Sequence, residues 1–288
     1  MKSTSLALVG ALLTFAPPAF AQDTATVEPI PAQTADPRGD FAIVGLGVAV
    51  LPEYEGSSDY AISPVPAAIG QVSGYRFILA GNRLSVDLIR DGFGPTWDVQ
   101  AGPVGVVNFN RNSSDAIDDP QVSLLDERGT AIELGGYVGI GKTGVLTSDF
   151  DRLSATVSYR YDVSGVHDSG ILTPTISYTT PLSTRSLVGL FVSAERVERG
   201  FGRAYFSVSP EESLRSGLPV YAARGGWKNY AIGLTGMRSL TGDLTGGLQL
   251  VVGGLYRRLL NDFGDSPVTS IAGSRNQWLG TVGVAYSF

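Results

Sequence analysis

The sequence contains no cysteine, a single histidine and few charged residues, which make up only 17% of the chain. The lack of cysteine excludes a disulfide and a lipid anchor attached to cysteine, and it removes the usual ligands of a structural zinc site. The formal net charge is −6, which argues against a nucleic-acid partner, because such partners require a cationic surface. We therefore expect no cofactor, no metal and no nucleic acid.

Long apolar runs are also missing after residue 21. A transmembrane helix needs about eighteen or more consecutive apolar residues. Lipid admits only helices and closed β-barrels, because every backbone polar group must be paired within the protein. A membrane protein with this sequence would therefore have to cross the bilayer with β-strands.

The N-terminal segment 1–21 is typical of a secretory signal peptide, with a basic start, an apolar run and an A-x-A cleavage pattern that ends at Ala21. Residues 22–39 are rich in Pro, Ala, Thr and Asp without periodicity, which predicts a flexible periplasmic lead-in. The folded domain is expected to be 40–288.

In that domain apolar residues alternate with small or polar ones, and a period of two residues predicts β-strands. In 152–162, for example, Val157 belongs to the apolar face and Ser158 to the polar face. The short pair 75–80 and 83–89 leaves ten spanning strands as the alternative to twelve, and almost no helix is expected. The predicted strands are 40–51, 60–71, 75–80, 83–89, 97–109, 131–141, 152–162, 171–181, 186–198, 227–239, 244–257 and 277–288.

The connections sort by length. With the N-terminus on the periplasmic side, the long connections 110–130, 199–226 and 258–276 all fall on the outer side, as is usual for outer-membrane barrels. We therefore predict an all-β fold: a single antiparallel up-and-down transmembrane β-barrel of about twelve strands in the cell outer membrane, with long external loops.

The last predicted strand has aromatic residues at both ends of its apolar face, which is typical of strands whose rings lie at the two membrane interfaces. Trp278 lies at one end, and Tyr286 and Phe288 at the other. Outer-membrane barrels commonly end on such an aromatic residue. Tyr286 and Phe288 are therefore the expected assembly signal, with the barrel assembly machinery as a partner.

Two loop segments have the motifs S-G-L-P-x-Y-x-x-x-G-G-x-K, in 216–228, and L-x-x-D-x-x-x-S-P-V, in 259–268. With these motifs the chain resembles the MipA/OmpV family, the MltA-interacting proteins of the outer membrane. The matching positions are Ser216, Gly217, Leu218, Pro219, Tyr221, Gly225, Gly226, Lys228, Asp262, Ser266 and Pro267.

The resemblance implies a scaffold in envelope and murein maintenance that brings a lytic murein transglycosylase to a murein synthase. Other members of the family look like porins or adhesins, so a narrow diffusion channel and a surface adhesin remain alternatives. The motif residues also have a local interpretation, because Gly217 and Pro219 favour a tight turn and Asp262 can bond backbone N–H groups. They are expected to form a folded plug or lid, with a ligand or partner surface as the alternative.

Candidates for chemistry are few. His167 and Ser169 could form a nucleophile–base pair, but they lie in a short polar segment where a solvated histidine is expected. Catalytic residues are therefore expected to be none, and the chain is expected not to be an enzyme. An acidic cluster in 110–130, expected to be solvated, could hold Ca²⁺ only weakly; it comprises Asp115, Asp118 and Asp119.

Charged residues fall into two groups. Those on predicted inward faces should pair across the lumen; they are Asp87, Asp98, Glu133, Arg152, Arg160, Asp162, Glu195 and Arg257. Cations beside the outer loops should bind lipopolysaccharide phosphates, with Arg203, Arg224 and Arg258 as the predicted contacts. The alternative is pairing with local acids such as Glu198 and Asp262. Lys228 is counted with this outer group.

Overall fold

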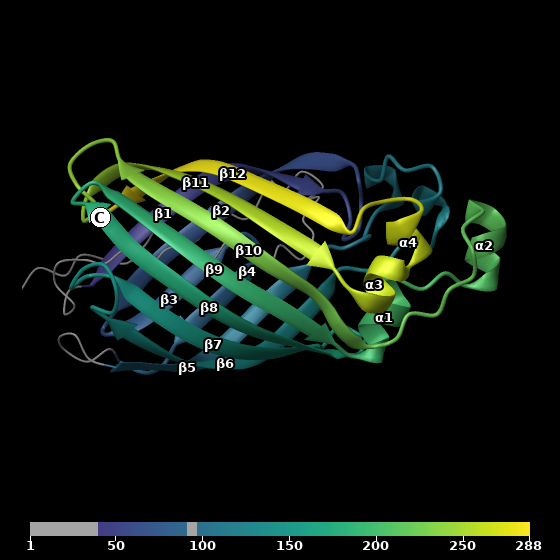
Figure 1. Ribbon diagram of the computed structural model, residues 1–288, viewed down its shortest axis with the longest axis horizontal. Helices are drawn as coiled ribbons and strands as arrows, with labels where there is room; N and C mark the ends of the chain where they lie inside the picture. Colours follow the sequence, from purple (N-terminus) through teal and green to yellow (C-terminus); the bar gives the residue numbers. More distant parts are fainter. Residues whose placement is uncertain (1–39, 91–96) are drawn as a thin grey trace, which may run out of the picture.

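The computed structural model describes residues 40–90 and 97–288, which form a closed barrel of twelve antiparallel strands (Figure 1). Each strand pairs with its neighbours in the chain, and β1 pairs with β12 to close the barrel. This confirms the predicted fold class. The predicted signal peptide (1–21) and lead-in (22–39) lie outside the described residues. The strands are β1 (Phe41–Pro52), β2 (Tyr60–Val72), β3 (Tyr75–Ala80), β4 (Arg83–Asp87), β5 (Trp97–Asn108), β6 (Ala131–Thr143), β7 (Arg152–Asp162), β8 (Gly170–Ser183), β9 (Ser186–Val197), β10 (Gly226–Ser239), β11 (Gly247–Leu259) and β12 (Asn276–Ser287).

The two ends of the barrel differ. One end, here called the lid end, has the long connections and four short helices, and the other, the turn end, has short turns (Figure 1). The expectation of almost no helix therefore underestimates the loops. No helix in the described ranges is long and apolar enough to cross a membrane. The helices are α1 (Arg199–Tyr205), α2 (Pro210–Ser216), α3 (Asn261–Asp265) and α4 (Pro267–Ser270), with 3-10 turns at Ser114–Ala116 and Val122–Leu124.

The β3–β4 hairpin is short but belongs to the wall, so the ten-strand alternative is wrong. β3 pairs with β2 only from Ala67 onward, so within the described chain residues 60–65 of β2 have no strand partner on that side. The Gly81 N–H donates to the Pro66 carbonyl, so the backbone of Pro66 faces the β3 side of β2. By alternation along the strand, the backbone of Pro64 faces the same side. Proline has no N–H donor, so it suits a strand edge that lacks a partner.

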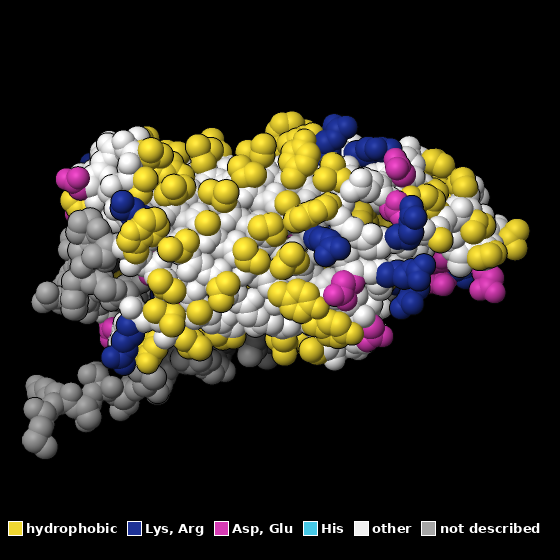
Figure 2. Space-filling view, turned by 60° about the horizontal axis from the view of Figure 1, so that its bottom comes forward, with side chains coloured by type: hydrophobic (Ala, Val, Ile, Leu, Met, Phe, Trp, Pro, Cys, Tyr) yellow, Lys and Arg dark blue, Asp and Glu magenta, His cyan; other side chains and the backbone are white. Residues whose placement is uncertain are grey.

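The strands alternate between a lipid-facing and a lumen-facing side, as predicted. The Val157 side chain is 44% exposed on the outer surface, whereas Ser158 is only 3% exposed. Hydrophobic side chains cover the outer surface between the two ends in the view of Figure 2. An apolar belt of this kind around a closed barrel is the surface that lipid requires. The chain is therefore an outer-membrane β-barrel.

Aromatic side chains border the belt at both ends. Tyr256 contacts both Tyr230 and Trp278 near the lid end, and Tyr286 contacts Phe288 at the turn end, with ring centroids 4.8 to 6.3 Å apart. Rings at these two levels are typical of the membrane–water interfaces.

Replacing Phe288 with alanine is expected to slow insertion into the membrane. The Phe288 ring is exposed at the turn-end interface, and its N–H donates to the Ala42 carbonyl of the neighbouring strand end, 2.9 Å away. The measurement is the fraction of pulse-labelled chain that reaches the outer membrane in its heat-modifiable, folded form. Trp97→Ala is the matched control, because Trp97 is another exposed aromatic residue at the turn end. Equal insertion of both variants would rule out a special role for Phe288.

Candidate functional site: a lid over a buried charge network

The loops at the lid end pack into a compact lid with two hydrophobic clusters of its own. The first cluster is built around Phe201, Phe206 and Phe263, and it reaches down to Ile171 and Val197 at the tops of β8 and β9. The second joins the loop after β1 to all three long loops through Tyr54, Val122, Val208, Leu218 and Val268. Loops that bury apolar side chains against one another are held in place, so the lid is a folded part of the molecule.

The first motif segment, 216–228, connects α2 to the rest of the lid. Gly217 ends α2 with φ of 74°, a left-handed conformation that favours glycine. Ser216 donates to the Glu212 carbonyl, and Leu218 is fully buried in the second cluster. Tyr221 donates from its hydroxyl to the Asp262 carbonyl, 3.0 Å away, and so connects the two motif segments. Pro219, between these contacts, lies in the turn that leads out of α2.

The second motif segment is anchored in the same way. Ser266 caps α4 and donates from its hydroxyl to the Phe206 carbonyl, 2.6 Å away, while Pro267 occupies the first turn of α4. The Tyr54 hydroxyl donates to the Ala272 carbonyl at 2.8 Å. These contacts agree with the expected lid held together by caps and turns.

Ion pairs tie the outer part of the lid together. Glu212 forms a capping box with Ser209 at the start of α2 and accepts a hydrogen bond from Arg128 at 2.9 Å. Burial alone would raise the pKa of Glu212, but hydrogen bonding to the Ser209 N–H and attraction to Arg128 outweigh it and lower the pKa. Hydrogen bonds from Arg224 likewise hold the pKa of Asp262 below its usual value.

A network of charged side chains lies beneath the lid, inside the barrel. The Lys228 Nζ lies 2.9 Å from a carboxylate oxygen of Glu55 and 2.9 Å from one of Glu195. Arg160 continues the network, because it pairs with Glu195 at 3.0 Å and also with Glu133. The Lys228 ammonium also lies 4.3 Å from the centroid of the Phe201 ring, so the network contacts the lid directly.

The network balances its own charge. Three carboxylates, of Glu55, Glu133 and Glu195, face three cations, of Arg160, Lys228 and Arg257, and all six side chains are buried. Two asparagine amides complete it: Asn108 donates to Glu133 at 3.0 Å and Asn229 to Glu195 at 2.9 Å. Buried charges are tolerated only when they are paired and hydrogen-bonded, so this arrangement requires every member.

The predicted inward charges are all found on the lumen side. At the turn end, Arg152 pairs with Asp98, and Asp87 is buried at the end of β4. Lys228, in contrast, does not belong with the outer cations. A register irregularity between Trp227 and Asn229 turns both Lys228 and Asn229 into the barrel.

His167 is buried, so the expectation of a solvated histidine is wrong. Its Nδ1 lies 2.7 Å from the Ser169 hydroxyl and its Nε2 lies 3.2 Å from a Glu133 oxygen, while its ring packs against Phe201. The Ser169 side chain is also buried. The three groups therefore act as part of the wall beneath the lid, and the absence of enzymatic activity stays a prediction.

The three arginines predicted to contact lipopolysaccharide have different environments. Arg224 pairs with Asp262 at 3.1 Å, which is the local alternative, and Arg258 bonds the Asn276 side chain at 3.1 Å. Arg203 is exposed on α1. Gly202, which precedes Arg203, packs closely against the Arg224 backbone, whereas Arg258 lies at the end of β11.

The predicted acidic cluster has structural contacts instead of a metal arrangement. Asp119 accepts from the Gln121 and Val122 N–H groups, and the Asp118 N–H donates to Glu53. No group of three or more potential metal ligands occurs within 40–90 and 97–288. Arg111 was missed by the sequence interpretation: it is buried in the lid and donates to the Tyr205 and Asp126 carbonyls. No local sequence signal distinguishes it from a solvated loop arginine.

Comparisons with known proteins give a family and a general likeness. A model of the family described as MltA-interacting protein MipA matches residues 44–288. None of the curated proteins matches the chain.

Among solved structures, the barrel is similar to the outer membrane channel DcaP of Acinetobacter baumannii, with 10% identity, 87% of this chain and 96% of that chain covered, and a TM-score of 0.39. It is also similar to the toluene transporter TodX of Pseudomonas putida, with 12% identity, coverage of 91% and 95%, and a TM-score of 0.37. An outer membrane channel from Pseudomonas putida F1 gives 12% identity, coverage of 91% and 100%, and a TM-score of 0.47. Scores this low carry no information about what this barrel binds or transports.

Proposed function

Because this chain belongs to the family described as MltA-interacting protein MipA, we propose that it is a non-enzymatic scaffold of the outer membrane. In this role it holds a lytic murein transglycosylase near a murein synthase. The lid end faces the cell surface, and the turn end faces the periplasm, where both enzymes work.

The observation that carries this proposal is the packing of the lid over the lumen-facing charge network. A diffusion channel requires an open path along the whole lumen, yet here the loops bury one another in two hydrophobic clusters. Beneath them, the charged side chains of Lys228, Glu195 and Arg160 are buried and paired with one another. A barrel closed in this way is suited to holding partners at its ends and poorly suited to passing solutes.

The turn 144–151 is the candidate contact for the murein enzymes. Asp151 fixes it by accepting hydrogen bonds from the Val145 and Leu146 N–H groups and from the Tyr178 hydroxyl. The fixed turn exposes Leu146 and Phe150, whose side chains are 71% and 65% accessible. Apolar side chains on a rigid turn lose little conformational freedom when a partner covers them.

The test is photo-cross-linking of the purified barrel to a purified lytic murein transglycosylase of the MltA type. A cross-linking residue at position 146 should capture the enzyme, and one at position 214, exposed on α2 of the lid, should not. The double variant Leu146→Asp and Phe150→Asp should weaken binding roughly tenfold or more, as expected when central apolar anchors are lost.

The alternatives give different outcomes. A diffusion channel would conduct ions freely in a planar bilayer as the unmodified protein. An adhesin would capture a host or surface ligand from position 214 and nothing from position 146. Either result, without binding of the transglycosylase, would rule out the scaffold.

A further inference from the structure

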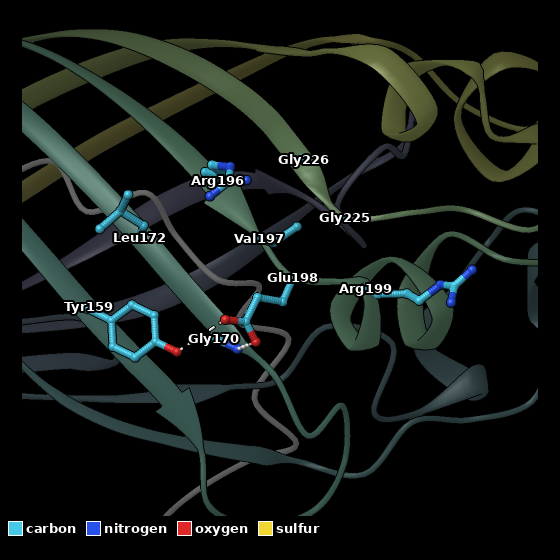
Figure 3. Close-up of a pocket in the computed structure, with 9 residues that line it drawn as sticks. All are labelled: Tyr159, Gly170, Leu172, Arg196, Val197, Glu198, Arg199, Gly225 and Gly226. Carbon is cyan, nitrogen blue, oxygen red and sulfur yellow. Dashed lines mark hydrogen bonds between the residues drawn. The ribbon is translucent and has the colours of Figure 1, made fainter.

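A pocket of about 380 Å³ lies on the outer surface of the barrel where β7 to β10 meet the lid. Figure 3 shows Tyr159, Leu172 and Arg196 on the strands, and Glu198 and Arg199 where β9 passes into α1. The start of β10 at Gly226 completes the rim.

The pocket lies at the level of lipid headgroups. Arg196 is paired in register with Trp227 of β10 and Leu172 of β8. Trp227 is exposed and lies on the lid side of Tyr230 along β10. Tyr230 belongs to the aromatic border at the lid end of the belt. A side chain at this height contacts the boundary between acyl chains and headgroups.

The charges on the strands favour an anionic ligand here. All five acidic residues within the described strands lie on the lumen side: Asp87, Asp98, Glu133, Asp162 and Glu195. The outer face near the lid carries instead the exposed cations Arg196 and Arg258. Figure 2 shows Lys and Arg side chains at the lid-side edge of the apolar belt, with Asp and Glu side chains among them. Exposed arginines on the strands at this level attract the phosphates of the outer leaflet.

In the described part of the chain Arg196 has no acidic partner, in contrast to two arginines of the lid. Arg224 pairs with Asp262, and Arg275 pairs with Asp265. The carboxylate of Glu198 accepts one hydrogen bond on each oxygen, from the Gly170 N–H at 2.9 Å and from the Tyr159 hydroxyl at 3.3 Å. No ion pair joins Arg196 or Arg199 to an acid within the described residues.

We propose that this pocket binds the phosphorylated sugar headgroup of a lipid of the outer leaflet. The Arg196 guanidinium donates to the phosphate. Leu172 and Trp227 contact the apolar part of the lipid beside the sugar. The remaining acceptor capacity of Glu198 suits a hydroxyl or amide donor of the sugar. This site is independent of the scaffold proposal, and Arg203, Arg224 and Arg258 are not among its lining residues.

The test measures binding of a bisphosphorylated glucosamine lipid, and of its dephosphorylated form, to the folded barrel in detergent by native mass spectrometry. Arg196→Gln should weaken binding of the phosphorylated lipid roughly five- to tenfold, as expected for loss of one charge-assisted contact. Binding of the dephosphorylated lipid should not change. Arg238→Gln is the matched control, because Arg238 is exposed at the turn end of the adjacent strand β10.

Three results would overturn the proposal. The first is equal binding of the phosphorylated lipid by the unmodified protein and by Arg196→Gln. The second is a loss seen with Arg224→Gln but not with Arg196→Gln, which would move the phosphate contact to the motif loop. The third is full competition by millimolar inorganic phosphate, which would indicate a site for free phosphate.

Discussion

Replacing Lys228 with methionine is expected to destabilise the folded barrel by roughly 3–5 kcal/mol, the usual effect of removing one partner from a buried ion pair. Lys228 is fully buried between Glu55 and Glu195. Its loss leaves two buried carboxylates with one cation fewer and removes the contact with the Phe201 ring. The measurement is the free energy of unfolding from a urea titration in detergent micelles.

Two variants make this test specific. Lys142→Met removes a lysine at the turn end that lies over the Trp97 ring at 5.3 Å, and it should change the stability by less than about 1 kcal/mol. Adding Glu55→Gln to Lys228→Met should recover part of the loss, because the network then regains its charge balance. A Lys228→Met barrel as stable as the unmodified one would contradict the role assigned to the network.

An arginine at position 157 is expected to cost roughly 2–4 kcal/mol, the range for a charge on the lipid face near the bilayer midplane. Val157 lies at the middle of β7 and faces outward. The measurement is a refolding titration in lipid vesicles, which compares the free energy of unfolding of the variant with that of the unmodified protein.

The best control is the neighbouring residue Thr156, which faces the lumen and is only partly buried. Thr156→Arg should cost clearly less than Val157→Arg, because water in the lumen can solvate the guanidinium. Ser158 also faces the lumen but is buried, so an arginine there would meet crowded neighbours and test packing as well as orientation. If Thr156→Arg proved more damaging than Val157→Arg, the orientation of β7 would be reversed.

The barrel could be predicted from the sequence because each strand carries its own signal. Lipid on one side and lumen on the other impose a period of two residues, so the faces of Val157 and Arg160 follow from local pattern alone. The unequal lengths of the connections then gave the arrangement of the loops. The few helices were not predicted individually, because they are only four to seven residues long and have no amphipathic repeat.

The lid and the charge network could not be predicted in the same way, because their contacts join distant parts of the chain. Tyr54 bonds Ala272, 218 residues away, and nothing near Tyr54 predicts that partner. The direction of Lys228 depends on the irregularity beside Trp227, which breaks the alternation that the sequence interpretation relied on. The lumen-side position of the strand acids was predicted from the sequence, but the pairing of Arg224 with Asp262 and of Arg275 with Asp265, which leaves Arg196 without an acid, depends on how the lid folds.

The charge network has a consequence for the rate at which the barrel forms and comes apart. Its members come from β5, β6, β7, β9, β10, β11 and the loop after β1, so no early fragment of the chain contains a complete set. Pairing between distant segments is slow to establish, because loop closure precedes any compensating contact. Once β1 has paired with β12, no single strand can leave the barrel without separating buried ion pairs of this network. The closed barrel should therefore unfold slowly in the membrane, because a high activation barrier separates it from the unfolded chain.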